Sequence, residues 1–284
     1  MSANNPYKEI ATEYARLLHS PIEPHPTPPS RPQLPADASK VLLFSPHPDD
    51  ECLTGALPLR LLREGQFKII NIAITLGSKK ERQQERWQEL QNACNFLGFE
   101  TIVPAKNGLE AINPSARQNN PQHWNEAVEI IADILAQYRP PIIFCPHEGD
   151  KHPTHIGTHY LVMDALQRCS DFCCCVVETE FWGAMESPNL MVESSCEDVA
   201  DLMAATACHV GEVQRNPYHL RLPAWMADNV RRGGELVGGA GARVPDFSFA
   251  TLYRQRYWAG GSWKEGTEGG EIVAVGDELR SRFF

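Results

Sequence analysis

Two short polar segments of the chain carry residue types that can hold a metal ion. Each follows an apolar run typical of a buried strand and precedes a stretch of helical character. The first segment, residues 45–51, places one imidazole and three carboxylates close together: His47, Asp49, Asp50 and Glu51. Because neighbouring carboxylates repel one another unless a proton or a cation relieves them, a divalent metal would stabilise this segment.

The second polar segment, residues 146–155, supplies further imidazoles: His147, His152 and His155. Ligands of open α/β sheets sit at the carboxyl ends of the strands, so two such segments after adjacent strands would meet. His47, Asp50 and one histidine of the second segment would make a three-ligand site. Two neutral imidazoles and one carboxylate suit zinc, with water in the open fourth position. Asp49 would remain beside that water, where a general base belongs.

At these residues the sequence resembles a known family. Residues 46–51, Pro-His-Pro-Asp-Asp-Glu, resemble the (A/P)HPDDE motif of the PIG-L, or LmbE-like, zinc-dependent N-deacetylases. Residues 152–155 resemble their HPDH motif, and residues 86–98 resemble their R-x-x-E-x-x-x-A-x-x-x-L-G helix. The matches occur in the family's order and cover roughly residues 40–210. Thr154 stands where the family has Asp, so any role of that carboxylate is absent here.

The resemblance implies a role for each candidate residue. The implied zinc ligands are His47, Asp50 and His155. Asp49 is the implied general base, and His152 would face the substrate carbonyl as an acid or an electrostatic stabiliser. Arg86 is expected to orient the site or to bind substrate, with a solvated charge on a helix as the equal alternative.

Other polar residues of the two segments have competing interpretations. His147 also sits at a strand end, so it could replace His155 as the metal ligand. Glu51 is expected to cap the following helix or to support the ligands from behind. His159 lies one helical turn after His155 and is interpreted as a supporting or packing residue.

The expected activity is the zinc-dependent removal of an acetyl group from an N-acetylated amino sugar or small glycoconjugate. Asp49 would take a proton from the attacking water, and the products would be acetate and a free amine. Three alternatives remain open. A non-haem iron oxygenase uses the same two imidazoles and one carboxylate, a magnesium-dependent phosphohydrolase would use the acidic pair, and a non-catalytic binding protein would use the same fold.

Composition narrows the class of partner. The chain has 284 residues, a hydrophobic fraction of 42% and a net charge of -10, without a dense Lys/Arg stripe. We therefore expect a small-molecule substrate, no nucleic acid and no membrane. No apolar run approaches the ~20 residues that span a bilayer, and the first residues do not resemble a secretory signal. The nine cysteines, an odd number, favour reduced thiols in a cytoplasm.

Strand-like and helix-like segments alternate along the chain. This order predicts a Rossmann-like α/β fold, with a mostly parallel sheet and helices on both faces. The expected strands are residues 41–44, 68–76, 101–103, 142–145, 172–182 and 189–193. The expected helices are residues 52–62, 81–97, 124–138, 156–168, 197–210 and 224–232. Residues 104–121 are expected to form a loop.

The two ends of the chain have their own character. Residues 1–39 are predicted to form an N-terminal helix, at 7–18, and a Pro-rich arm, and residues 40–284 the deacetylase domain. That domain would end in a Gly-rich stretch, Gly233, Gly234 and residues 238–241, interpreted as a hinge or lid near the site, and in an aromatic tail. The aromatic side chains of the tail would line a sugar site or an oligomer interface, with plain packing as the favoured role of each one singly. The arm and the tail are the reason to expect a homo-oligomer.

Overall fold

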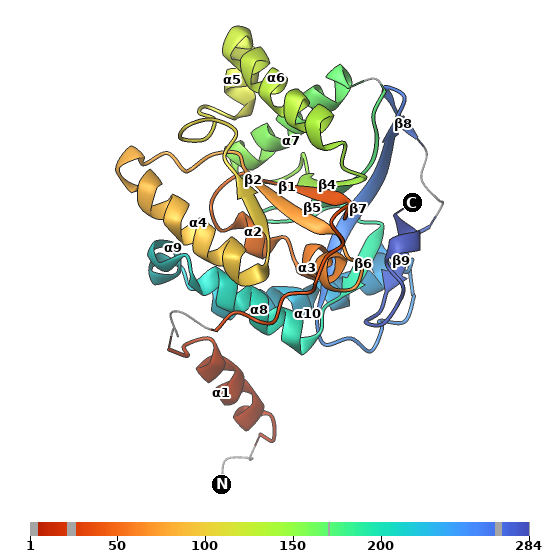
Figure 1. Cartoon of the computed structure of the whole chain (residues 1–284). Helices are drawn as coiled ribbons and strands as arrows, with labels where there is room; N and C mark the ends of the chain where they lie inside the picture. The colour runs from red at the N-terminus through yellow and green to blue at the C-terminus, as the bar shows by residue number, and fades with distance from the viewer. Residues whose placement is uncertain (1–4, 22–26, 170, 265–268, 284) are drawn as a thin grey trace.

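The computed structural model describes residues 5–21, 27–169, 171–264 and 269–283 (Figure 1). Its described residues form one nine-stranded sheet in the order β3-β2-β1-β4-β5-β7-β6-β9, with β8 paired to β7. The strands are β1 (Lys40–Ser45), β2 (Lys68–Ala73), β3 (Glu100–Ile102), β4 (Ile142–Pro146), β5 (Cys173–Thr179), β6 (Leu190–Glu193), β7 (Ala250–Ala259), β8 (Ser262–Lys264) and β9 (Glu271–Val273).

The first five strands are all parallel. β1 pairs with β2 and β4, β3 extends from β2, and β5 extends from β4. This order, 3-2-1-4-5, is the one expected of a Rossmann-like sheet, and it confirms the predicted fold class. Beyond β5 the sheet changes character, because β7 runs antiparallel to both β5 and β6.

Helices cover both faces of the sheet, as predicted (Figure 1). Successive residues of a strand point to opposite faces, so Val41 and Leu43 pack into one apolar core and Leu42 and Phe44 into the other. The helices of the described residues are α1 (Lys8–Leu17), α2 (Asp50–Leu53), α3 (Ala56–Arg63), α4 (Gln83–Leu97), α5 (Pro114–Asn119), α6 (Pro121–Tyr138), α7 (Pro153–Arg168), α8 (Cys196–Ala207), α9 (Val210–Arg215) and α10 (Tyr218–Leu236), with short 3-10 turns at Lys80–Arg82 and Arg280–Arg282. The core of Val41 includes residues of α3, α4, α8 and α10, and the core of Leu42 includes residues of α6 and α7.

Two expectations about loops are wrong. The predicted loop 104–121 contains α5, where Asn113 accepts a hydrogen bond from the backbone N–H of Ala116 and Pro114 opens the helix. The predicted hinge at Gly233 and Gly234 lies inside α10, and a Cβ on Gly233 would come within 2.4 Å of the Met191 sulfur. Close packing, not mobility, therefore explains these glycines.

The aromatic tail is also not an extension. Its first part forms β7, a strand between β5 and β6 in the sheet. Tyr253 and Trp258 are buried in the two cores, so packing, the role favoured for each one singly, is confirmed for these two, and they line neither a sugar site nor an interface. This ten-residue strand was not predicted from the sequence, because its polarity is mixed and it stands alone after the glycines.

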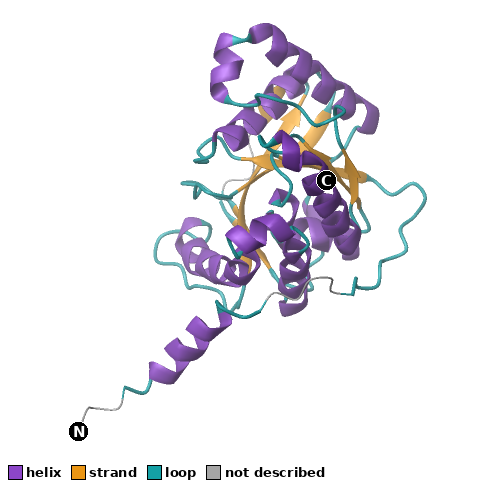
Figure 2. Cartoon of the chain, turned by 90° about the vertical axis from the view of Figure 1, so that its left-hand side faces the viewer, coloured by secondary structure: helices purple, strands orange, loops and turns teal. Residues whose placement is uncertain are grey.

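The N-terminal helix, in contrast, lies outside the two cores. Helix α1 extends away from the rest of the chain in both views (Figures 1 and 2), and its apolar residues Ile10, Tyr14 and Leu17 are exposed, as is Tyr7 just before it. Residues 27–39 of the Pro-rich arm contain neither helix nor strand, and Arg31 donates a hydrogen bond to the carbonyl of Asn95 at 2.6 Å. Residues 22–26 of the arm lie outside the described residues. The division at residue 39 and the homo-oligomer stay predictions.

Among the described residues, no helix combines the length and the apolar character needed to cross a bilayer.

Candidate active site

The two polar segments meet at one edge of the sheet. The first leads from β1 into α2, and the second leads from β4 into α7. Since β1 and β4 are adjacent and parallel, with Val41 opposite Ile142, their carboxyl ends lie side by side. The sequence prediction that the segments lie together is confirmed.

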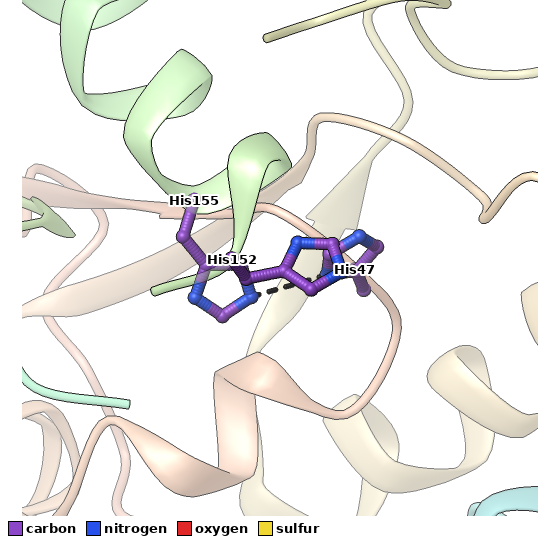
Figure 3. Close-up of side chains that lie close together, drawn as sticks. All are labelled: His47, His152 and His155. Atoms are coloured by element: carbon purple, nitrogen blue, oxygen red, sulfur yellow. Dashed lines mark hydrogen bonds between the residues drawn. The ribbon is translucent and has the colours of Figure 1, made fainter. Parts of the chain in front are cut away.

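Three candidate ligand atoms form an almost regular triangle. His47 Nδ1 lies 3.2 Å from His155 Nε2 (Figure 3), and Asp50 Oδ2 lies 3.3 Å from each of these nitrogens. A tetrahedral zinc site with bonds of about 2.0–2.1 Å has ligand–ligand edges of about 3.3–3.4 Å. The triangle therefore fits a zinc-sized ion.

Within this triangle, the carboxylate of Asp50 and the imidazole of His155 shift each other's pKa. Burial opposes ionisation of Asp50, but His155 and His47 outweigh it and lower the pKa of that carboxyl. Burial also opposes the charged form of His155, yet Asp50 and Asp150 raise the pKa of the imidazole to about 10. In the absence of a metal, the site is a carboxylate paired with an imidazolium.

His152 lies beside the triangle, with a ring nitrogen within 4.8 Å of ligand atoms of His47 and His155. Its ring meets that of His47 edge-on at 4.7 Å (Figure 3), and the backbone N–H of Thr154 donates to its Nδ1 at 3.2 Å. A neutral ring that accepts at Nδ1 carries its proton on Nε2. Burial, together with the charges of His47 and His155, lowers the pKa of His152, so the ring is a neutral donor.

Asp49 sits next to the ligands in a strained backbone. Its φ is 119°, in the left-handed region that costs a non-glycine residue of order 1–3 kcal/mol. Burial and the negative charge of Asp50 raise the pKa of Asp49 well above its usual value, and His209 and Arg86 oppose the rise. A carboxylate with a raised pKa is a stronger base, which suits the predicted role.

Arg86 joins α4 to this loop. It donates a hydrogen bond to the Pro48 carbonyl at 2.8 Å, and its guanidinium lies 3.8 Å from carboxylate oxygens of both Asp49 and Glu212. Of the two predicted alternatives, a solvated helix charge is wrong, because the side chain is only 14% exposed. Arg86 orients the loop and also lines the pocket described below.

Asp150 was not given a role from the sequence. One of its carboxylate oxygens accepts from the backbone N–H of His152 at 2.8 Å and lies 3.6 Å from His155 Nδ1. The other accepts from the backbone N–H groups of Trp182 and Gly183. At 3.6 Å this contact is not a hydrogen bond, and buried His155 Nδ1 has no hydrogen-bond partner among the described residues, so Asp150 acts on the ring through its charge. The place of Asp150 two residues before His152 was the available signal in the sequence.

His147, the competitor for the metal, and His159, the predicted supporting or packing residue, both point elsewhere. His147 Nε2 lies 2.7 Å from the Gly183 carbonyl, and His159 Nδ1 lies 3.0 Å from the Pro146 carbonyl. Both rings are buried against these partners, away from the triangle.

A second cluster of metal-binding residue types lies behind the loop. Glu51, Cys52 and His209 are all buried and have ligand atoms within 4.8 Å of one another. One oxygen of Glu51 accepts from Cys52 Sγ and faces His209 Nε2 at 2.6 Å, while the other accepts from the backbone N–H of Asp49. These hydrogen bonds account for the cluster and confirm that Glu51 supports the loop from behind.

A cavity of about 590 Å³ opens in front of the triangle, a size suited to a small ligand. Its lining includes the triangle, Asp49 and His152. The opposite walls carry aromatic and basic side chains: Lys79, Lys80, Arg82, Arg86, Trp182, Arg215 and Tyr218.

A known protein family matches the part of the chain that carries the triangle. The family model described as PIG-L, GlcNAc-PI de-N-acetylase, matches residues 42–166. This segment belongs to the PIG-L family. The predicted resemblance is thereby confirmed for both motifs and the helix between them.

A named deacetylase is similar to about half of the chain. The 1D-myo-inositol 2-acetamido-2-deoxy-alpha-D-glucopyranoside deacetylase of Mycobacterium leprae (strain Br4923) is 26% identical over 157 residues, covering 46% of this chain and 51% of the relative. The chain thus spans about half the length of that relative.

Solved structures share the fold at low identity. The N,N'-diacetylchitobiose deacetylase of Pyrococcus horikoshii superposes with a TM-score of 0.57 at 16% identity, covering 92% of this chain and 96% of that one. A 4-carboxy-2-hydroxymuconate hydratase from Pseudomonas putida KT2440 superposes with a TM-score of 0.58 at 13% identity, covering 81% and 99%. The fold accommodates more than one reaction, so the reaction must be argued from the site.

The PIG-L segment supplies only part of that site. The ligand triangle, Asp49 and His152 come from it, whereas further wall and support residues follow it in the sequence: Trp182, His209, Glu212, Arg215 and Tyr218. These residues are not predictable from the sequence, because no local pattern distinguishes a pocket tryptophan or arginine from an ordinary surface residue.

Proposed function

We propose that this protein is a metal-dependent hydrolase that removes the acetyl group from an N-acetylated amino sugar or small glycoconjugate. The observation that carries the proposal is the triangle of His47, Asp50 and His155 with Asp49 beside it in one pocket. The similarity to named deacetylases supports the reaction.

The three triangle residues would hold the metal. Two imidazoles and one carboxylate at mutual distances of 3.2–3.3 Å suit zinc, with one position left open. When bound there, zinc would polarise the acetyl carbonyl and lower the pKa of a water molecule to about 7. Asp150 would stand 3.6 Å behind His155 Nδ1, where its negative charge makes the ring a better ligand.

Asp49 acts as the general base. It accepts a proton from the water whose oxygen bonds to the acetyl carbon, and its raised pKa increases its basicity. When the carbon–nitrogen bond breaks, the same proton passes from Asp49 to the amine nitrogen. Acetate and a free amine leave, and Asp49 is again ionised.

His152 stabilises the charge that develops on the carbonyl oxygen. Its neutral ring carries a proton on Nε2, which is free to donate because Nδ1 is already bonded by Thr154. A donor held in place before the reaction stabilises an oxyanion without reorganising. The lowered pKa of His152 keeps it in this neutral form at pH 7.

An acetate-release assay tests the proposal. The protein is stripped with a chelator and then offered zinc, iron(II) or magnesium, with methyl 2-acetamido-2-deoxyglucoside as substrate. Zinc should restore the release of equal amounts of acetate and amine. Oxygen consumption with iron(II) would instead indicate the oxygenase alternative, since iron(II) oxygenases use the same ligand set. Binding of the sugar without turnover under any metal would leave the non-catalytic alternative.

A further inference from the structure

The loop between β5 and β6 reaches the site with two aromatic side chains. The Phe181 ring meets that of the proposed ligand His155 edge-on at 4.9 Å, and the next side chain, Trp182, lines the cavity. Both residues follow the segment that the PIG-L model matches, which ends at residue 166. Part of the cavity wall therefore depends on contacts that this later region of the chain makes for itself.

Glu180, the first residue of this loop, ties the loop together. It is 2% exposed, and one oxygen of its carboxylate accepts a hydrogen bond from the backbone N–H of Met185 at 2.6 Å. Residues 180–185 are thus closed into a compact turn with Trp182 inside it. A buried carboxylate has lost its hydration, so it needs a countercharge to remain ionised.

Arg232 supplies this countercharge from α10. Its guanidinium donates to both carboxylate oxygens of Glu180, at 2.8 and 2.9 Å, in the paired geometry that strengthens such bonds. It also donates to Oδ1 of the buried Asn229 at 3.1 Å. The next residue, Gly233, lies close against the Met191 sulfur of β6, so this part of α10 is packed on the sheet. Arg232 therefore joins the loop to a fixed part of the fold.

The same helix meets the loop again at its first residue. The ring of Tyr218 lies edge-on to that of Trp182 at 5.6 Å, and both rings line the cavity. Tyr218 and Arg232 are 14 positions apart on α10, or about 21 Å along the helix axis. Two contacts so far apart hold the loop against rotation relative to the helix. The ion pair thus helps to set where the Trp182 ring stands beside Tyr218.

We propose that Arg232 is a positioning residue for the substrate wall, and that it holds the Trp182 ring against the sugar through Glu180. This inference rests on the proposed deacetylase function, because it assumes a pyranose substrate. Neither Glu180 nor Arg232 lines the cavity, so both act through Trp182. The role needs a guanidinium, because the ammonium group of a lysine cannot donate to both oxygens in the same planar, paired geometry.

Two conservative variants test the proposal. Glu180→Gln keeps the size of the side chain, and Arg232 is 15% exposed, so its charge is not sealed from water. KM for methyl 2-acetamido-2-deoxyglucoside should rise about threefold, and by no more than in Trp182→Ala, with little change in kcat. Arg232→Lys retains the charge but loses the paired hydrogen bonds, and it should also raise KM. An unchanged KM in both variants would overturn the inference.

A double-mutant cycle distinguishes positioning from a general loss of stability. In the Trp182→Ala background, Glu180→Gln should not raise KM further, because the ring that it positions is gone. The matched control is Asp198→Asn, which removes the charge from a similarly buried partner of Arg63, outside the cavity. This control should leave KM unchanged. A rise in KM that persists without Trp182, or that equals the rise in Asp198→Asn, would overturn the inference.

The position of Trp182 can also be measured without turnover. With 5-fluorotryptophan in place of the six tryptophans, the fluorine NMR signal that Trp182→Phe removes belongs to Trp182. Glu180→Gln should shift or broaden this signal and leave that of Trp263 unchanged. If this occurs but no N-acetylated sugar is deacetylated, the positioning role stands and the deacetylase proposal fails. An unchanged Trp182 signal in an active enzyme would overturn the positioning role while deacetylation stands.

Discussion

His209 and Glu51 are 158 residues apart in the sequence, and their side chains meet at 2.6 Å in a buried ion pair. The other oxygen of Glu51 accepts from the backbone N–H of Asp49 at 3.0 Å. Because Asp49 has a strained φ of 119°, this hydrogen bond helps to hold the proposed base in place. His209 thus supports the site through Glu51, without reaching the cavity.

Removal of His209 should therefore destabilise the protein. His209→Gln leaves the Glu51 charge buried without its cation, a change that costs about 3–5 kcal/mol. Urea unfolding followed by circular dichroism measures the free energy of unfolding. The double variant Glu51→Gln/His209→Gln, which buries no net charge, should recover part of the loss. A single variant as stable as the wild type would show that the pair is not ionised.

The same pair predicts a pH dependence. Burial opposes the charged form of His209, but Glu51 outweighs it and raises the pKa above the usual value of 6.5. A raised pKa contributes stability that is fully present below the unfolded pKa and is lost as pH rises through the folded pKa. The difference in unfolding free energy between wild type and His209→Gln should therefore shrink above about pH 6.5. A constant difference across pH 6–9 would contradict this.

Variants of Asp49 and Asp50 should distinguish a loss of catalysis from a loss of metal binding. Asp49→Asn keeps the shape but removes the base, so zinc should remain bound while turnover falls by about 10²–10⁴-fold. Asp50→Asn should instead lose zinc, because a neutral amide is a poor zinc ligand. Elemental analysis and acetate release on both variants test the pair. The reversed pattern would exchange the two roles, and near-normal activity in both would place the chemistry elsewhere.

Metal binding should release a proton. The pKa of His155, raised to about 10, means that the imidazole is protonated at pH 7 before the metal binds. Since a ligating imidazole is neutral, apparent zinc affinity should rise about tenfold per pH unit while His155 is protonated. Calorimetry at pH 7 in buffers of different ionisation enthalpy counts the released protons. Full zinc retention in His155→Ala would remove this residue from the site.

The site was predictable where local sequence decides position. The segment at residues 46–51 follows a buried parallel strand, so its place at the sheet edge follows from topology alone. The second segment follows from the same rule. His209 could not be found in this way, because its partner is set by the packing of α8 on α2, a long-range contact without a sequence pattern. The same holds for the strand β7, whose neighbours in the sheet are distant in the chain.

Trp182 offers the sharpest test of the substrate's shape. It is 55% exposed, yet its loop is fixed: Asp150 accepts from its backbone N–H at 3.0 Å, and the next carbonyl, that of Gly183, lies 2.7 Å from His147 Nε2. Its ring meets Tyr218 edge-on at 5.6 Å, and both rings line the cavity. A rigid, exposed aromatic wall suits the apolar face of a pyranose ring.

Trp182→Ala should therefore raise KM for a pyranoside by about threefold to tenfold, with little change in kcat. Trp182→Phe should retain most of the affinity, since an aromatic ring remains. The acyclic analogue N-acetylglucosaminitol presents no ring face. Its KM should therefore be the same for wild type and Trp182→Ala. The control is Trp263→Ala, another exposed tryptophan, which lies outside the cavity. Equal losses for the ring and the acyclic substrate would mean that Trp182 only maintains the loop, and that the sugar lies against another wall.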